Sequence, residues 1–320
     1  MKRFLFFSLL LTLSMLLLVS CGGVSDAGTT VPQTSATTTA AITTTTPITT
    51  TASEFLYKKN DDGGIRIQGY LGNQSTIVIP AEIEGLPVVE IGNAAFTSSW
   101  CKASVVSVIL PNTLKTIDDN AFEGSAISEI NLPNTLTHIG SRAFADCKGL
   151  TYITISSDCL DDASHEAFCD SGLENVVLAE GVTEIPASAF VNTKLREITI
   201  PQTVTSINFQ AFAGCESLQT VVLNEGLQSI ADMAFYGTAL QELSIPASVN
   251  RLSKYAFMKS NLLHSLRFLG DAPDGFLDKE SFYSVIYPDY VPTFVIYFYE
   301  GAEGFTAPEW NGIPSMKVFH

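Results

Sequence analysis

Residues 195–212 read LREITIPQTVTSINFQAF, and this stretch decides the fold because its pattern of apolar residues recurs along the chain. Counted from Leu195, apolar residues follow at offsets of 3, 5, 9, 12 and 17, the last being Phe212. The same ladder starts again at Val105, Ile127, Leu173, Leu218 and Leu240. A fixed period of this size predicts a solenoid, in which each coil packs on its two neighbours.

An Ala-Phe pair closes each unit. Its phenylalanines are separated by 26, 22, 24, 22, 22, 23 and 22 residues. We expect the alanine to let the backbone pack closely and the phenylalanine to fill the centre of the coil, on a short helical or 3₁₀ turn. The phenylalanines are Phe96, Phe122, Phe144, Phe168, Phe190, Phe212, Phe235 and Phe257.

The first part of each unit predicts a short strand. In Leu195–Ile200 apolar and polar residues alternate and β-branched types are frequent, so one face should point inward. Pro201 ends the strand because proline has no N–H to donate, and Val204 and Ile207 carry the chain back across the core. Strands stacked about 4.8 Å apart would form a parallel sheet along one side.

The repeated pattern L-x-x-I-x-I-P, x-x-V-x-x-I and x-x-A-F resembles the BspA-like class of bacterial leucine-rich repeat, and so does the entry segment with Gly69–Gly72, Ile77–Pro80 and Gly85–Gly92. The resemblance covers residues 55–320 and implies a leucine-rich-repeat solenoid, a right-handed superhelix with coils of about 22–23 residues. It also implies a surface or secreted binding protein, since adhesion is reported for some members, but it supplies no ligand. The expected parts are an N-terminal capping coil at 55–96, repeats at 97–268 and a C-terminal cap at 269–320 with a closing strand at 294–299.

The beginning of the chain predicts export. Residues 1–20 carry Lys2 and Arg3 and then an apolar run, as a signal peptide does. Residues 18–21, Leu-Val-Ser-Cys, resemble the lipobox of bacterial lipoproteins, in which the cysteine receives a diacylglycerol and becomes the new N-terminus. Cys21 is therefore the predicted lipid attachment site, and two acyl chains suffice for durable membrane attachment. An ordinary signal peptide or a transmembrane anchor is the alternative.

Residues 21–54 predict a disordered tether. Between Thr29 and Thr51, 13 of 23 residues are threonine. Such a tract buries too little apolar surface to offset the conformational entropy that it would lose on ordering. The expected location is thus the bacterial cell surface, with the solenoid tethered to the membrane by lipid. The sequence leaves open whether this membrane is a Gram-positive membrane or a Gram-negative outer membrane, and whether the threonines carry sugars.

The charged residues argue against several functions. The formal net charge is −16 and no basic stripe is visible, which excludes nucleic acid as an expected partner. The four histidines are scattered and no catalytic or phosphate-binding motif occurs, so we expect no enzyme, no catalytic residue and no cofactor. Cys147 and Cys215 should be small buried residues three coils apart. The disulfide state of the remaining cysteines stays open: Cys101, Cys159 and Cys169.

One coil departs from the pattern. After Ile155 the proline is missing, and acidic residues gather around His165. A calcium loop is one interpretation, because hard cations prefer several carboxylates. The spacing matches no calcium motif, however, so we expect a solvated bulge and no metal. The acidic residues are Asp158, Asp161, Asp162, Glu166 and Asp170.

The outward strand positions are the candidate ligand contacts. They are mostly small and polar, without an aromatic stripe or a basic ladder, so the face either binds a partner or is a solvated sheet. We predict a non-enzymatic adhesin that binds an extracellular protein or glycan. The alternative is a structural envelope component that self-associates or binds cell wall, and the oligomeric state stays open. The candidate positions are Glu129, Asn131, Tyr152, Thr154, Asn175, Glu197, Thr199, Thr220, Glu242 and Ser244, with Val177 and Val222 beside them.

Overall fold

The computed structural model describes residues 50–98, 104–156, 158–274 and 294–319. The predicted signal peptide, Cys21, nearly all of the threonine tract and Cys101 lie outside the described residues. Within the described ranges, no helix has both the length and the apolar character needed to cross a membrane.

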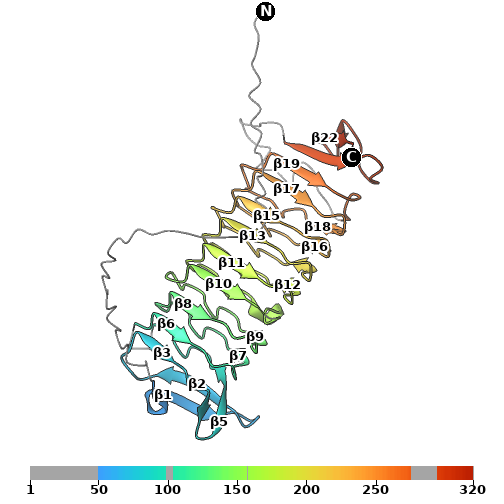
Figure 1. The fold of residues 1–320 in the computed structure, drawn as a ribbon. Coiled ribbons are helices and arrows are strands. Elements are labelled where there is room, and N and C mark those ends of the chain that lie inside the picture. The colour runs from blue at the N-terminus through green and yellow to red at the C-terminus, as the bar shows by residue number, and fades with distance from the viewer. Residues whose placement is uncertain (1–49, 99–103, 157, 275–293, 320) are drawn as a thin grey trace, which may run out of the picture. The chain divides into compact units, whose positions relative to one another are not determined.

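Short strands line one side of a solenoid and pair in parallel (Figure 1). Strand β6 (Ser107–Ile109), for example, pairs in register with β3 (Thr76–Val78) and β8 (Glu129–Asn131). The outer surface of these strands is called the strand face below. The strands that continue it are β10 (Tyr152–Ile155), β11 (Asn175–Leu178), β13 (Glu197–Thr199), β15 (Thr220–Val222), β17 (Glu242–Ile245) and β19 (Ser265–Phe268).

A second column of strands runs along another side of the coils. Each of these strands has only two residues, because a single inward residue at offset 12, such as Ile207, is enough to reach the core. The strands are β7 (Thr116–Ile117), β9 (His138–Ile139), β12 (Glu184–Ile185), β14 (Ser206–Ile207), β16 (Ser229–Ile230) and β18 (Arg251–Leu252). Each pairs in parallel with the equivalent strand of a neighbouring coil, and the pairing forms two separate sheets, one that contains β7 and β9 and one of β12, β14, β16 and β18.

The Ala-Phe step forms the remaining side and differs from the expected helical turn. Its amides alternate. Ala121 and Glu123 donate to carbonyls three residues back, as in a 3₁₀ turn, whereas Phe122 and Gly124 donate to the next coil. Asn120 and Gly124 accordingly have φ of 55° and 64°, which a 3₁₀ helix does not allow. The step is therefore a series of linked turns with left-handed residues four positions apart, such as Asn120 and Gly124, and every second amide donates to the neighbouring coil.

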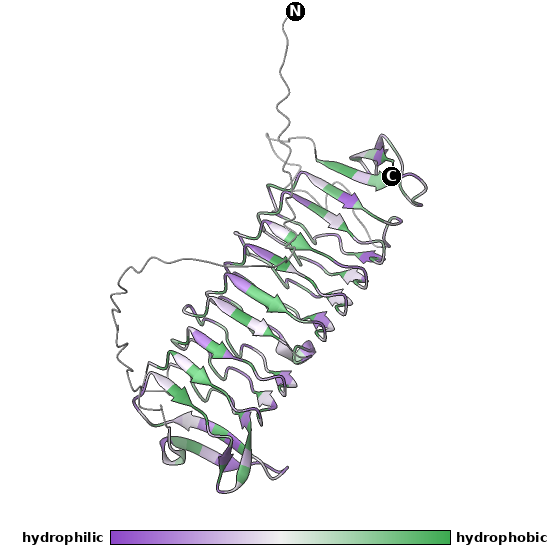
Figure 2. Ribbon diagram, in the orientation of Figure 1, coloured by the Kyte–Doolittle hydropathy of each residue, from purple (hydrophilic) through white to green (hydrophobic). Residues whose placement is uncertain are grey.

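The phenylalanine column forms the core, as predicted. All eight rings are buried, and each stacks on the next with centroids 5.0–5.7 Å apart and planes within 10° of parallel. The preceding alanines are fully buried and leave room for this stack. Figure 2 shows hydrophobic and hydrophilic residues alternating along the strands, which is how each strand sends one face into the core.

A column of small buried side chains stands three residues after the phenylalanines. Cys147 Sγ donates to the carbonyl of Phe122 at 3.1 Å, and Cys215 Sγ donates to that of Phe190 at 3.1 Å. Both cysteines are buried, as expected, and they also satisfy a buried carbonyl of the preceding coil. Serine or threonine stands at the same place in the other described coils: Ser125, Ser171, Thr193, Thr238 and Ser260.

These cysteines should resist thiol reagents in the folded protein. Burial raises the pKa of Cys147 and of Cys215 to about 11. At pH 8 a thiol with a pKa of about 11 is ionised in roughly one molecule in a thousand, and the thiolate is the nucleophile. In a chain whose other four cysteines are changed to serine, we expect Cys147 and Cys215 to react only after unfolding in denaturant. Rapid labelling of Cys147 or Cys215 in the native protein would contradict this burial.

The acidic coil contains a short 3₁₀ helix, η2 (Asp162–Ser164), rather than the repeat's usual second strand. Asp161 caps it, since its carboxylate accepts from the Ala163 amide at 2.9 Å. The Ser164 hydroxyl is buried and donates to the carbonyl of Ile139 in the preceding coil. A polar cap and a buried hydroxyl thus stand where coils such as that of β14 place the inward isoleucine of their second strand.

Antiparallel strands close the N-terminal end of the described solenoid. After η1 (Ala52–Glu54), strand β1 (Phe55–Lys59) pairs with β2 (Ile65–Tyr70), and β2 continues in parallel to β5 (Leu86–Ile91). Strand β4 (Glu82–Ile83) folds back on β5 through Glu84 and Gly85, both with positive φ. Such a two-residue turn matches the twist of a tight hairpin.

The strand predicted at 294–299 is present as β20 (Val295–Tyr299), which pairs in parallel with β19. It is not the last strand, because β22 (Ile313–Val318) pairs with β20 and is itself joined to β21 (Glu309–Trp310). The Trp310 ring packs 4.8 Å from Phe305 and 6.3 Å from Phe268 between centroids. These aromatic rings cover the apolar residues of the last coils.

Candidate binding face

The strand face follows directly from the alternation of side chains along each strand. In β13, Ile198 points into the core and is buried, so Glu197 and Thr199 must point outward. All ten candidate positions lie on such strands. Thr154 is half-buried and the other nine are exposed. The sequence offsets therefore placed these residues on the outward side of the strands.

Parallel register arranges the outward residues in two columns. In the first, Tyr152 lies opposite Asn175, and Glu197 lies opposite Thr220. In the second, Thr154 lies opposite Val177, and Thr199 lies opposite Val222. The columns bring together side chains about 23 residues apart in sequence, as in any solenoid sheet.

Two adjoining hollows lie in this face. The first, about 640 Å³, spans β10 to β15, and its walls include Tyr152, Asn175 and Glu197. The second, about 770 Å³, spans β15 to β20, and both hollows share Thr220 and Val222. Apart from Thr154, the candidate residues from Tyr152 onward therefore line one continuous depression rather than a flat sheet.

The face has a mixed chemical character. Val177 and Val222 are 46% and 45% exposed, but polar residues lie opposite both of them, so they form no contiguous apolar patch. The Tyr152 hydroxyl bonds to Thr154 Oγ1 at 2.7 Å. Glu197 and Glu242 have no salt bridge within the described part of the chain, which leaves two carboxylates open to solvent on the strand face.

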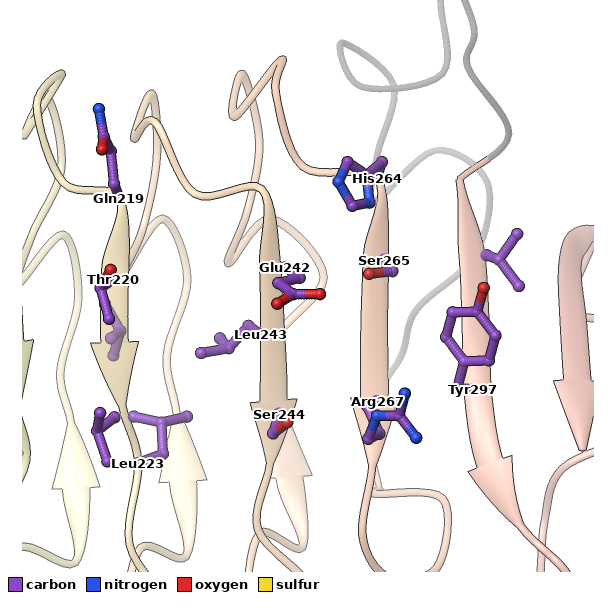
Figure 3. Close-up of a pocket in the computed structure, with 13 residues that line it drawn as sticks. Gln219, Thr220, Leu223, Glu242, Leu243, Ser244, His264, Ser265, Arg267 and Tyr297 are labelled. Atoms are coloured by element: carbon purple, nitrogen blue, oxygen red, sulfur yellow. The ribbon is translucent and has the colours of Figure 1, made fainter. Parts of the chain in front are cut away.

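Several residues in the second hollow were missing from the prediction, among them His264, Arg267 and Tyr297 (Figure 3). The apolar ladder continues through Leu263, Leu266 and Phe268, so the offset count, extended by one coil, would have found Arg267 as an outward residue. Tyr297 follows a segment without the repeat, so no count from the earlier coils reaches it. Arg267 Cζ lies 5.4 Å from the centroid of the Tyr297 ring.

The acidic residues of the irregular coil have separate partners. Asp161 Oδ2 lies 3.2 Å from His138 Nδ1, and the Thr183 hydroxyl donates to Asp158. Glu166 binds Arg142 at 2.6 Å. Across the described ranges, no group of three or more His, Cys, Asp or Glu side chains converges as a metal site would require. The carboxylates of Asp158, Asp161 and Glu166 are thus used in contacts between coils.

Arg142 joins these coils on the Ala-Phe side. Its guanidinium lies 2.6 Å from Glu123 and 2.6 Å from Glu166, which belong to the preceding and the following coil. The hydrogen bonds that Arg142 donates to Glu123 raise the pKa of Arg142 above its usual value, and the bond that it donates to Glu166 acts in the same direction. The network ties three coils together and lies apart from the strand face.

Comparison with known protein families agrees with this architecture. The chain matches the family described as the BspA type leucine-rich repeat region, in six copies, over residues 89–208 and 183–294. Together these segments cover more than half of the chain. The chain therefore belongs to the BspA-type leucine-rich-repeat family, as its repeat pattern predicts.

Comparison with solved structures also finds leucine-rich-repeat proteins. A leucine-rich-repeat protein of T. pallidum is 30% identical, with a TM-score of 0.50, over 59% of this chain and 88% of that one. A leucine-rich-repeat protein of Bacteroides ovatus is 20% identical, with a TM-score of 0.52, over 83% of this chain and 75% of that one. A leucine-rich cell surface protein of Faecalibacterium prausnitzii is 20% identical, with a TM-score of 0.42, over 85% of this chain and 95% of that one. No curated protein sequence matches.

Proposed function

We propose that this protein is a non-enzymatic, lipid-anchored adhesin whose strand face binds an extracellular protein or glycan. The observation that carries the proposal is the continuous depression over β10 to β20. It is lined by exposed hydroxyls and by Glu197 and Glu242, which have no charged partner in the described chain. Leucine-rich-repeat proteins are typically binding scaffolds rather than enzymes, and solenoids bind through extended surfaces of this kind.

The location of the protein is part of the proposal. Residues 1–20 resemble an export signal, Cys21 occupies the lipidated position of a lipobox, and the threonine-rich tract that follows has the composition of a tether. A tethered solenoid would present the strand face to molecules outside the cell. Membership of a family of bacterial surface repeat proteins supports exposure at the cell surface.

A structural envelope component is the second candidate, and one observation favours it. Met316 and Phe319, in and just after β22, are 53% and 73% exposed. Apolar side chains on the last described strand are suited to contact with another molecule, such as a second copy of this chain or a wall polymer. In this alternative the strand face is only a solvated sheet.

The test compares two triple variants of the full-length chain displayed on cells. The strand-face variant carries Tyr152→Ala, Glu197→Gln and Glu242→Gln. We expect its adhesion to immobilised matrix proteins, mucins, glycans or cell wall to fall at least about tenfold, the effect of losing about 1.4 kcal/mol of binding free energy. Surface amounts are matched by antibody staining, so that display and binding are separated.

The matched control carries Tyr255→Ala, Glu180→Gln and Glu216→Gln, which removes one tyrosine and two carboxylates from exposed positions outside the strand face. It should adhere as the unchanged chain does. Full adhesion by the strand-face variant would contradict the proposal that the strand face binds the ligand. If, in addition, Met316→Ser and Phe319→Ser abolish self-association in sedimentation experiments, the envelope alternative is the better account.

A further inference from the structure

The second hollow of the strand face contains charged groups of both signs that do not pair with each other. It spans β15, β17, β19 and β20 and has a volume of about 770 Å³. Glu242 and Arg267 project into it from neighbouring strands (Figure 3). Opposite charges this close in a sheet commonly form a salt bridge, but within the described residues neither of them does.

The Arg267 side chain packs against an aromatic ring and makes no salt bridge to a described carboxylate. Its guanidinium lies 5.4 Å from the Tyr297 ring centroid, and Figure 3 shows it pointing toward that ring. In contrast, Arg66 binds both Glu90 and Asp118. Among the described residues no carboxylate lies within 4.0 Å of Arg267. The ring limits its motion, and its donors remain available to a ligand.

Glu242 is set back from Arg267 by the register of the sheet. Ser244 lies opposite Arg267 and Glu242 lies opposite Ser265, so the two charged residues are diagonal neighbours. Their Cα atoms are then about 8 Å apart, from a strand spacing of about 4.8 Å and a rise of about 3.3 Å per residue. A ligand the size of one substituted sugar ring bridges this distance. The hydroxyls of Ser244, Ser265 and Thr220 lie around it.

We propose that this hollow binds a sugar residue that bears a carboxylate, such as a sialic or uronic acid, exposed on a glycan chain. Arginine pairs with a planar carboxylate through two parallel hydrogen bonds, so Arg267 would bind the acid group. Glu242 would accept from hydroxyl or amide N–H groups of the same sugar, while the serine and threonine hydroxyls would bond to its ring substituents. This assignment rests on the strand face being the ligand surface, and it names the ligand class.

The arrangement fits other ligand classes less well. A run of acidic residues in a peptide would bring a second carboxylate close to Glu242, where like charges repel. A polyanion would need several basic groups, whereas the protein has a formal net charge of −16 and the basic side chains of this hollow are one arginine and one histidine, Arg267 and His264. A neutral sugar would leave the Arg267 donors without a partner once water is displaced. One carboxylate beside several hydroxyls satisfies all of these groups.

The experiment measures binding of the purified full-length chain, in detergent, to four immobilised probes. These are a glycan ending in sialic acid, one ending in a uronic acid, the matching neutral glycan and a glutamate-rich peptide. We expect binding to at least one acidic glycan, and at least about tenfold weaker binding to the neutral one, as for loss of a charge-assisted bidentate pair. Reducing the sugar carboxylate to an alcohol should have the same effect.

Variants then assign the binding to these residues. Arg267→Ala should lose acidic-glycan binding by at least about tenfold, and Arg267→Lys should recover only part of it, because lysine keeps the charge without the planar fork. Glu242→Gln should weaken binding while leaving the preference for the carboxylate. The control is Arg251→Ala, which removes an exposed arginine of β18 outside this hollow. Thermal melts of all variants exclude loss of folding.

Any of three binding results would overturn the assignment, and so would the absence of binding to every glycan. The three are equal binding of acidic and neutral glycans, stronger binding of the glutamate peptide than of any glycan, and unchanged binding by Arg267→Ala. The proposal that the strand face is the ligand surface can be tested separately from the ligand class. If no glycan binds but cell adhesion still requires Tyr152 and Glu197, the strand face remains the ligand surface and only the carboxylated-sugar assignment falls.

Discussion

Phe212→Ala is expected to lower the free energy of unfolding by about 3 to 5 kcal/mol, the usual cost of truncating a fully buried phenylalanine. The Phe212 ring is completely buried and stacks on Phe190 and Phe235, each at 5.5 Å between centroids. Removing it leaves a cavity that faces two other rings, and stacked coils cannot close in on it without breaking their parallel hydrogen bonds. Phe190→Ala should cost a similar amount for the same reason.

Denaturant unfolding of the purified chain, followed by circular dichroism, measures both effects. Glu197→Ala is the control, since this exposed strand-face residue should change stability by no more than about 0.5 kcal/mol. Equal and small effects from all three substitutions would mean that the phenylalanine column is not the core. A loss confined to one part of a multi-step transition would show instead that the coils unfold in separate groups.

The fold was predictable because every coil repeats the same set of contacts. A single Phe could lie on a surface, but eight of them at a nearly constant spacing require one column, and the structure stacks them. The same redundancy fixed the inward and outward positions of the strands. Glu197 and Thr199 were assigned to the outer face from the alternation around Ile198 alone, and both are exposed.

The backbone of the Ala-Phe step could not be predicted from local preference. Arg142, Glu166 and Met233 adopt φ of 55°, 57° and 57°, although such residues seldom occupy the left-handed region. The neighbouring coil determines this conformation, because the amide of Arg142 then donates to the carbonyl of His165. A sequence window that contains only one coil carries no information about that bond.

The second hollow was beyond prediction for a similar reason. Arg267 follows the offset count, but its partner Tyr297 reaches the adjacent strand only after a long segment without the repeat. The depth of the depression also depends on side chains from four strands at once. Sequence alone could thus place outward residues one by one, while the contact between Arg267 and Tyr297 required the structure.

Cys21→Ala is expected to abolish lipid attachment and to prevent normal processing of the chain. The diacylglycerol is joined through the cysteine sulfur, and alanine has no atom that can carry it. Processing of bacterial lipoproteins follows lipid addition, so the variant should either keep residues 1–20 or be released from the membrane. The effect should be all-or-none, because the two acyl chains of Cys21 are the proposed source of durable attachment.

Cells grown with a fatty-acid probe and then fractionated provide the measurement. The unchanged protein should carry the probe, run at its processed mass and remain with the membranes, and Cys101→Ala should behave identically because it removes a thiol outside the lipobox-like segment. The alanine variant should carry no probe. If it still appears in the membrane fraction at the normal processed mass, an ordinary signal peptide with another means of attachment explains residues 1–21 better than a lipobox. The adhesin proposal would then keep its binding face but lose its anchor, since nothing in the strand-face argument depends on how the solenoid is held at the membrane.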